Sequence, residues 1–446
     1  MVSFGNIQFL RLTFLLLFLT ILGRNLFSAN QYWDRHDGST GASTGVTASG
    51  DWDDSNWNSN ADGSGSNGTW SNGNTAIFSA GSDATGISSI TANLNNATLG
   101  GLTVEEGDIT IEASGSGTLT LSANADFEVA EGSTLTITEP LLYDGKTLNK
   151  IGEGLLTINA NNTPGVGGTT TITQGKIDLS SAVTNFTGNI TGVGTTKSML
   201  GGDGIVNSAT FGNANGEIDF VSPGLGLSSS MTNNTSRQQL SAADDERSSG
   251  AEAVGSLTVT NLALNGGTIY DWEIADFSPG TNNGSAYDVL KYSSIAFESG
   301  QKIGVNILAV QNSDGAAGRF NNFSNAVNNY SNVNGFHFLQ STSGNHASNG
   351  PTSQGDASSY FDLYTDSFDY YYGPGVGSWG VWYDGSGDFY LTYSAVPEPS
   401  TYIMISALFL IIGFNQSSRK TLHSMIVSLR QKFSKNTNQP VPAELS

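Results

Sequence analysis

The sequence predicts an all-β protein, a right-handed parallel β-helix built from short, closely spaced strands. Between Ile87 and Leu179, apolar residues recur in pairs one residue apart, as in Leu102–Val104, Ile109–Ile111 and Leu135–Ile137. This period-two alternation predicts strands with one buried face. Because each short strand can bury its face only against its neighbours, recurrence at short intervals predicts a solenoid. A β-sandwich is the alternative.

The N-terminal segment has the features of an export signal. Arg11 precedes the apolar segment Leu12–Leu22, which has the length of a signal-peptide core. We expect residues 1–29 to form a signal peptide that is cleaved near Ser28-Ala29, with an uncleaved membrane anchor as the alternative. The chain has no cysteine, so it has neither disulfides nor thiolate chemistry.

Residues 30–86 are dense in Trp, Asp, Asn and Gly. Trp rings flanked by turn-forming residues predict short strands and tight turns, with the aromatic side chains capping one end of a core. An alternative is that Trp52 and Trp57 contact glycans, since the faces of Trp rings bind sugars. The cluster Asp51, Asp53 and Asp54 lacks the spacing of a calcium loop, so we expect a solvated turn and no metal.

Residues 87–224 form the predicted solenoid, and its clearest unit spans residues 148–179. That unit reads Leu-Asn-Lys-Ile-Gly-Glu-Gly-Leu-Leu from Leu148, followed by Gly-Lys-Ile from Gly175. It resembles the autotransporter-associated β-strand repeat. The Trp-rich stretch that ends at Trp70–Phe78 is similar to the N-terminal cap in front of such repeats. The resemblance implies a β-helix of the autotransporter-passenger type and transfers no catalytic residue.

The rest of the exported region continues the same pattern. Residues 225–254 are polar and predict an exposed insertion loop. Residues 255–330 contain further alternating strands, such as Leu257–Val259, and predict more rungs. Residues 331–395 are rich in aromatic residues and predict a C-terminal cap, in which Asp384–Asp388 forms the turn of a hairpin. Such a cap would cover the exposed edge of the last rung.

Residues 396–420 combine three features in order. The prolines of Pro397-Glu398-Pro399 exclude a helix interior and predict an extended, accessible motif. The uncharged segment Tyr402–Phe414 predicts a C-terminal transmembrane helix. Arg419 and Lys420 follow it and predict the cytoplasmic side of the membrane, as do the basic residues of the predicted cytoplasmic tail, 421–446.

These residues resemble the PEP-CTERM sorting signal of exported proteins in Gram-negative bacteria. The resemblance implies that an exosortase, a membrane transpeptidase, reads Pro397, Glu398 and Pro399 and removes the tail. It also implies that the C-terminal helix anchors the chain in the inner membrane before processing, with Arg419 and Lys420 as the membrane-stop residues. The tail from Thr421 to Ser446 is longer than is usual in that family.

Charge and composition narrow the classes of function. Residues 30–395 contain 10 Lys and Arg against 37 Asp and Glu, a net charge of −27, which argues against a nucleic-acid partner. His36, His337 and His346 lack metal-ligand spacing, and no catalytic pair of carboxylates stands out. We therefore expect no cofactor and no enzymatic activity.

The expected function is that of a non-enzymatic structural protein of the cell surface or extracellular matrix. Its expected partners are the exosortase, the membrane before processing, and a polysaccharide or exopolymer. A carbohydrate-binding or adhesion protein is the alternative class, and a polysaccharide lyase or glycosidase on a β-helix is the third.

Overall fold

The computed structural model describes residues 28–36, 38–42, 49–84, 87–92, 97–113, 117–160, 168–184, 186–192, 198–212, 219–224, 254–274, 286–309, 335–344, 347–366, 368, 377–395, 426–428 and 430. The chain divides into one unit of Met1–Pro374 with Trp379–Ser394 and a second of Gly375–Ser378 with Ala395–Ser446. In the second unit, residues 426–428 and 430 are helical. The predicted insertion loop, except for its last residue, and the predicted signal-peptide core lie outside the described residues.

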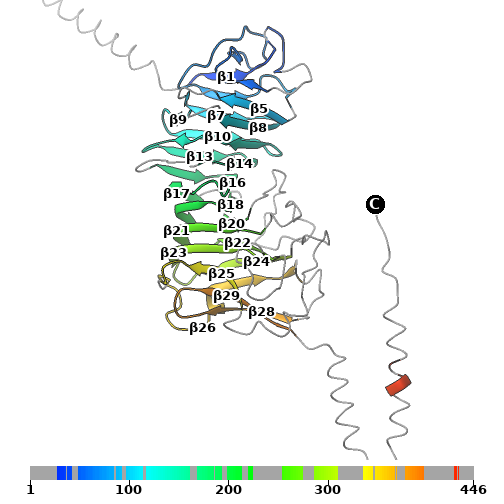
Figure 1. The fold of residues 1–446 in the computed structure, drawn as a ribbon, viewed down its shortest axis with the longest axis vertical. Helices are drawn as coiled ribbons and strands as arrows, with labels where there is room; N and C mark the ends of the chain where they lie inside the picture. Colours follow the sequence, from blue (N-terminus) through cyan, green and yellow to red (C-terminus); the bar gives the residue numbers. More distant parts are fainter. Residues whose placement is uncertain are drawn as a thin grey trace, which may run out of the picture. The chain divides into compact units, whose positions relative to one another are not determined.

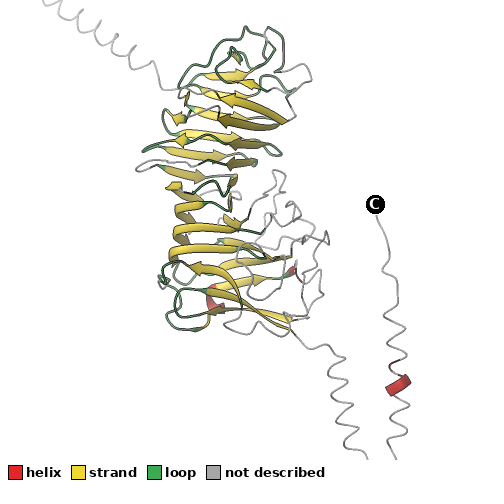
Figure 2. Ribbon diagram, in the orientation of Figure 1, coloured by secondary structure: helices red, strands yellow, loops and turns green. Residues whose placement is uncertain are grey.

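Strands dominate the described chain (Figure 2). The largest sheet has 15 strands; in the order of hydrogen-bonded neighbours they are β26 (Gly355–Asp356), β28 (Gly377–Tyr383), β29 (Phe389–Ala395), β25 (Phe336–Ser341), β23 (Val289–Phe297), β21 (Ser256–Leu264), β19 (Ile205–Phe211), β17 (Phe186–Gly192), β15 (Thr169–Ile172), β13 (Thr147–Ile151), β10 (Ala125–Val129), β7 (Gly101–Val104), β4 (Thr75–Phe78), β1 (Asn30–Trp33) and β3 (Trp57–Asn58).

A second sheet has 11 strands: β2 (Gly50–Asp51), β5 (Ile87–Ala92), β8 (Asp108–Ala113), β11 (Thr134–Ile137), β14 (Leu155–Ile158), β16 (Gly175–Leu179), β18 (Ser198–Gly202), β20 (Asp219–Pro223), β22 (Ile269–Ile274), β24 (Ile303–Ala309) and β27 (Phe361–Tyr364). A third sheet has three: β12 (Leu141–Leu142), β9 (Leu119–Leu121) and β6 (Ala97–Leu99). A short 3₁₀ helix, η2, spans Ser358–Tyr360.

Successive strands of the chain alternate between the sheets (Figure 1). Each of the units β4–β6, β7–β9 and β10–β12 places one strand in each sheet, and from β13 to β24 the chain alternates between the two larger sheets. Each strand pairs in parallel with its counterpart in the next unit, so Leu135 of β11 lies between Ile109 of β8 and Leu156 of β14. The prediction of a mostly β chain is confirmed, and most strand pairs of its two larger sheets are parallel.

The alternating apolar residues of both larger sheets form the core. Leu102 and Val104 of β7 are fully buried, as is Ile111 of β8. The hydroxyl of Tyr270 on β22 donates a hydrogen bond of 3.1 Å to the carbonyl of Phe338 on β25, which joins the two sheets across this core. Burying each large apolar side chain contributes about 1.5 to 3 kcal/mol, and in-register stacking repeats that contribution in every unit.

Four strands of the 11-stranded sheet differ from the prediction of one buried face. All described side chains of β16, β18, β20 and β22 are buried, whereas β10 alternates between buried and exposed residues. On these strands and on β14, Leu155, Met199, Phe220 and Ile269 form a buried apolar cluster. These residues lie in one continuous row of the sheet, with Lys176 between Leu155 and Met199.

Near the C-terminal end of the larger sheet the pairing changes from parallel to antiparallel. Strand β25 pairs antiparallel with β29, and β26 pairs antiparallel with β28. The predicted turn at Asp384–Asp388 joins the neighbouring strands β28 and β29, and the Asp384 amide donates a hydrogen bond of 3.1 Å to the Asp388 carbonyl. Aromatic side chains gather here, with Phe361 5.3 Å from Phe338 and 5.7 Å from Phe389 between ring centroids.

Candidate functional site

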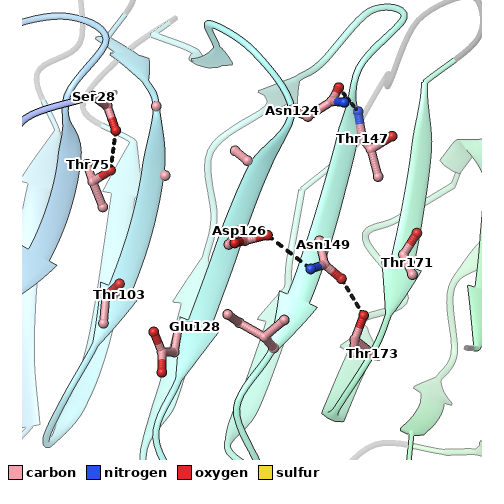
Figure 3. Close-up of a pocket in the computed structure, with 14 residues that line it drawn as sticks. Ser28, Thr75, Thr103, Asn124, Asp126, Glu128, Thr147, Asn149, Thr171 and Thr173 are labelled. Carbon is pink, nitrogen blue, oxygen red and sulfur yellow. Dashed lines mark hydrogen bonds between the residues drawn. The ribbon is translucent and has the colours of Figure 1, made fainter. Parts of the chain in front are cut away.

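A groove of about 660 Å³ crosses the outer face of the 15-stranded sheet over β4, β7, β10, β13 and β15 (Figure 3). Hydroxyl, amide and carboxylate side chains dominate its surface. The 14 residues that line it are Ser28, Thr75, Gly100, Gly101, Thr103, Asn124, Ala125, Asp126, Glu128, Thr147, Asn149, Ile151, Thr171 and Thr173.

The alternation of β10 turns two carboxylates outward. Ala125, Phe127 and Val129 are buried in the core, so Asp126 and Glu128 project from the opposite face and are exposed. The parallel register then places Asp126 opposite Asn149 and Glu128 opposite Ile151 on β13. Outward polar residues of successive units therefore form rows that run across the strands.

A chain of hydrogen bonds fixes the orientation of the central polar side chains. The Nδ2 of Asn149 donates to Oδ1 of Asp126 at 3.0 Å, and Oγ1 of Thr173 donates to Oδ1 of Asn149 at 2.6 Å. Figure 3 shows these three side chains pointing toward one another from neighbouring strands. Each of them retains further hydrogen-bonding capacity, because a carboxylate, an amide and a hydroxyl can each form more than the bonds made here.

Glycines allow neighbouring residues to pack closely at one side of the groove. A Cβ atom at Gly100 would lie 2.4 Å from the Gly73 carbonyl oxygen and 2.6 Å from the Ser28 Cβ, and one at Gly101 would lie 3.2 Å from Oγ1 of Thr75. Any larger residue at Gly100 would therefore displace its neighbours. The hydroxyls of Ser28 and Thr75 are 2.7 Å apart and form a hydrogen bond at this edge.

The charge of the groove is negative. Two of its 14 lining residues, Asp126 and Glu128, carry carboxylates, and none of the 14 is Lys or Arg. Glu128 is exposed, and within the described part of the chain no hydrogen bond to its carboxylate is found. The lining therefore attracts cations and repels anions at short range, with a strength that depends on salt.

The nearest basic side chain on these strands points to the other face. Lys150 of β13 is fully buried, and its Nζ donates to the carbonyl oxygens of Ile151 at 2.8 Å and Gly152 at 2.7 Å. Burial, assisted by the charge of Lys176, lowers the pKa of Lys150 to about 7, whereas the carboxylate of Glu128 raises it. Lys150 thus binds turn carbonyls and offers no contact to a ligand in the groove.

The two tryptophans predicted as glycan contacts are part of the core. Trp52 is 0% exposed and Trp57 is 1% exposed. Their ring centroids are 4.6 Å apart, and the indole N–H of Trp57 donates to the Trp52 carbonyl oxygen at 2.9 Å. Trp33, Trp70 and Phe78 complete the cluster. A sugar needs an exposed ring face, so this burial agrees with an aromatic cap and disagrees with glycan contact at Trp52 and Trp57.

The other predicted site residues lie outside the described residues: Pro397, Glu398 and Pro399 of the sorting motif, and the membrane-stop residues Arg419 and Lys420. The same holds for the apolar segment Tyr402–Phe414. Among the residues that the structure does describe, no helix is long and apolar enough to cross a bilayer. Over the same ranges, no three His, Asp or Glu side chains come together as metal ligands.

Sequence reasoning missed the groove. The register places Asp126 opposite Asn149 and Asn149 opposite Thr171, and Thr173, two residues beyond Thr171, reaches Asn149 through its hydroxyl. The alternation of each unit showed that these positions face solvent, but the register between units was needed to align them. Polar residues at matching positions of consecutive repeats are the signal that could have indicated such a row.

Comparison of the chain with protein-family models, with curated proteins and with solved structures finds no match.

Proposed function

We propose that this chain is a non-enzymatic, exported structural protein of the cell surface or extracellular matrix, built as a right-handed parallel β-helix. The observation that carries this proposal is the return of successive strands to the same mostly parallel sheets, three sheets for β4–β12 and two for β13–β24, with strands of consecutive units paired in parallel, as in β11–β14 and β14–β16. The strands of a β-sandwich are mostly antiparallel, so the parallel pairing favours the β-helix over that alternative.

The local chemistry of residues 148–179 supports an autotransporter-type repeat. Gly152, directly after β13, and Gly175, the first residue of β16, have positive φ angles of 74° and 77°. A Cβ atom at Gly175 would lie 2.2 Å from the Gly152 carbonyl oxygen, so consecutive turns stack too closely for a side chain there. The spaced Gly and Lys residues of the repeat are thus explained by stacking and carbonyl binding, without a catalytic role.

The C-terminal residues support sorting at the membrane. In this proposal Pro397, Glu398 and Pro399 form a PEP-CTERM motif that an exosortase reads, while the apolar segment Tyr402–Phe414 anchors the chain in the inner membrane and Arg419 and Lys420 stop its passage. Removal of the tail then releases the β-helix to the cell surface or the matrix. The net charge of −27 over residues 30–395 suits an extracellular, soluble surface.

Intact-mass analysis of membrane and extracellular fractions from the native host tests the sorting step. We expect an extracellular form that ends near residue 397, and we expect Glu398→Ala to leave a full-length form in the membrane. Glu444→Ala is the matched control, because it removes the other acidic residue of the C-terminal region and should mature normally. Normal maturation of Glu398→Ala would contradict the proposal.

A further inference from the structure

The groove described above has the chemistry of a binding site for a hydroxyl-rich, positively charged ligand. Thr103, Asn149 and Thr173 offer hydroxyl and amide groups, and Asp126 and Glu128 offer carboxylates. None of the 14 lining residues is aromatic or basic. Recognition in this groove must therefore rest on hydrogen bonds and on charge, without stacking against a ring.

Three other classes of ligand fit the groove less well. An extended peptide that adds to a sheet needs a free strand edge, but β7, β10 and β13 each have hydrogen-bonded neighbours on both sides. A folded protein partner needs apolar anchors, and Ile151 is the only large apolar residue of the lining. An anionic polymer would be repelled by Asp126, by Glu128 and by the acidic exported region as a whole.

We propose that the groove binds a segment of a polysaccharide that carries ammonium groups, such as a polymer of de-N-acetylated hexosamine. The ammonium groups pair with Asp126 and Glu128, and the sugar hydroxyls bond to the Thr and Asn side chains of neighbouring strands. Because adjacent strands lie about 4.8 Å apart, a polymer laid across them meets a polar side chain at every strand. The side chains of Asp126, Asn149 and Thr173 are already held in place by their hydrogen bonds, which reduces the entropy lost when a ligand binds.

This inference goes beyond the proposed structural role, and its test does not depend on processing of the tail. The probe is the hexamer of glucosamine, titrated calorimetrically into the purified full chain at low and high salt. Hexamers of N-acetylglucosamine and of galacturonic acid serve as the neutral and anionic comparisons. We expect saturable binding of the glucosamine hexamer that weakens as salt is added.

Three variants locate the site. Asp126→Asn with Glu128→Gln should weaken binding about tenfold, which is about 1.4 kcal/mol. Asp108→Asn with Glu112→Gln is the matched control, because it removes two exposed carboxylates from β8 in the other large sheet, and it should change binding less than about twofold. Thr103→Trp fills the groove and should abolish binding. All five positions are outward-facing, so the thermal unfolding midpoint reports whether each variant is folded.

Several results would overturn the inference. These are no saturable binding by the unmodified chain, equal losses in the two charge-neutralised pairs, unchanged binding by Thr103→Trp, or tighter binding of the neutral or anionic hexamer.

Discussion

Gly152 provides a direct test of how closely consecutive turns stack. It has a φ angle of 74°, and a Cβ atom built on it would lie 2.3 Å from the Val129 carbonyl oxygen of the preceding unit. We therefore expect Gly152→Ala to lower the free energy of unfolding by more than the strain of the left-handed conformation alone. The same carbonyl oxygen accepts a hydrogen bond of 2.9 Å from the Gly154 amide, so moving it has a further cost.

The magnitude follows from two contributions. An alanine in the left-handed region costs about 1 to 2 kcal/mol. Displacing the Val129 oxygen, with loss of its bond from Gly154, costs about 1 to 3 kcal/mol more. Gly132→Ala is the control, because Gly132 has a φ angle of 78° and nothing within 4 Å of its Cβ position. It should show only the first contribution.

Urea unfolding of the full chain, followed by far-UV circular dichroism, compares the two variants with the unmodified protein. Stacked repeats need not unfold in one step, so hydrogen exchange provides a local measurement. In Gly152→Ala the Gly154 amide should exchange faster than in Gly132→Ala. Equal shifts of the urea midpoint, together with equal exchange at Gly154, would refute the close stacking of these turns.

Two further predictions concern the core. Because the pKa of Lys150 is lowered to about 7, the folded chain binds fewer protons than the unfolded chain above that pH. The free energy of unfolding should therefore rise from pH 7 to pH 9 by at most about 1.4 kcal/mol per pH unit. A Lys150→Met variant that keeps this rise would show that the pH dependence does not come from Lys150. Trp57→Ala should lower the free energy of unfolding by about 3 to 5 kcal/mol, since Trp57 is buried among other aromatic rings. Unchanged thermal stability combined with a loss of sugar binding would instead indicate a ligand-contact role for Trp57.

Local patterns in the sequence predicted the strands well. The pairs Leu102–Val104, Ile109–Ile111 and Leu135–Ile137 lie in β7, β8 and β11 with their apolar side chains buried. Such pairs are readable because strand alternation depends only on neighbouring residues of the same segment. The turn at Asp384–Asp388 was readable for the same reason. The Trp-rich stretch was expected to cap one end of the core; its rings form a buried cluster, and residue types alone could not show whether a given ring is buried.

What the sequence by itself determined was the mostly β class, the short repeated strands and their buried faces, because these follow from local residue order. Only the tertiary structure decided which strands pair. In the folded chain both faces of β16, β18, β20 and β22 are buried, Trp52 and Trp57 are enclosed, and Asp126, Asn149 and Thr173 meet in one groove. The physical reason is that register joins residues more than 20 positions apart, and a shift of one residue would turn each side chain to the opposite face.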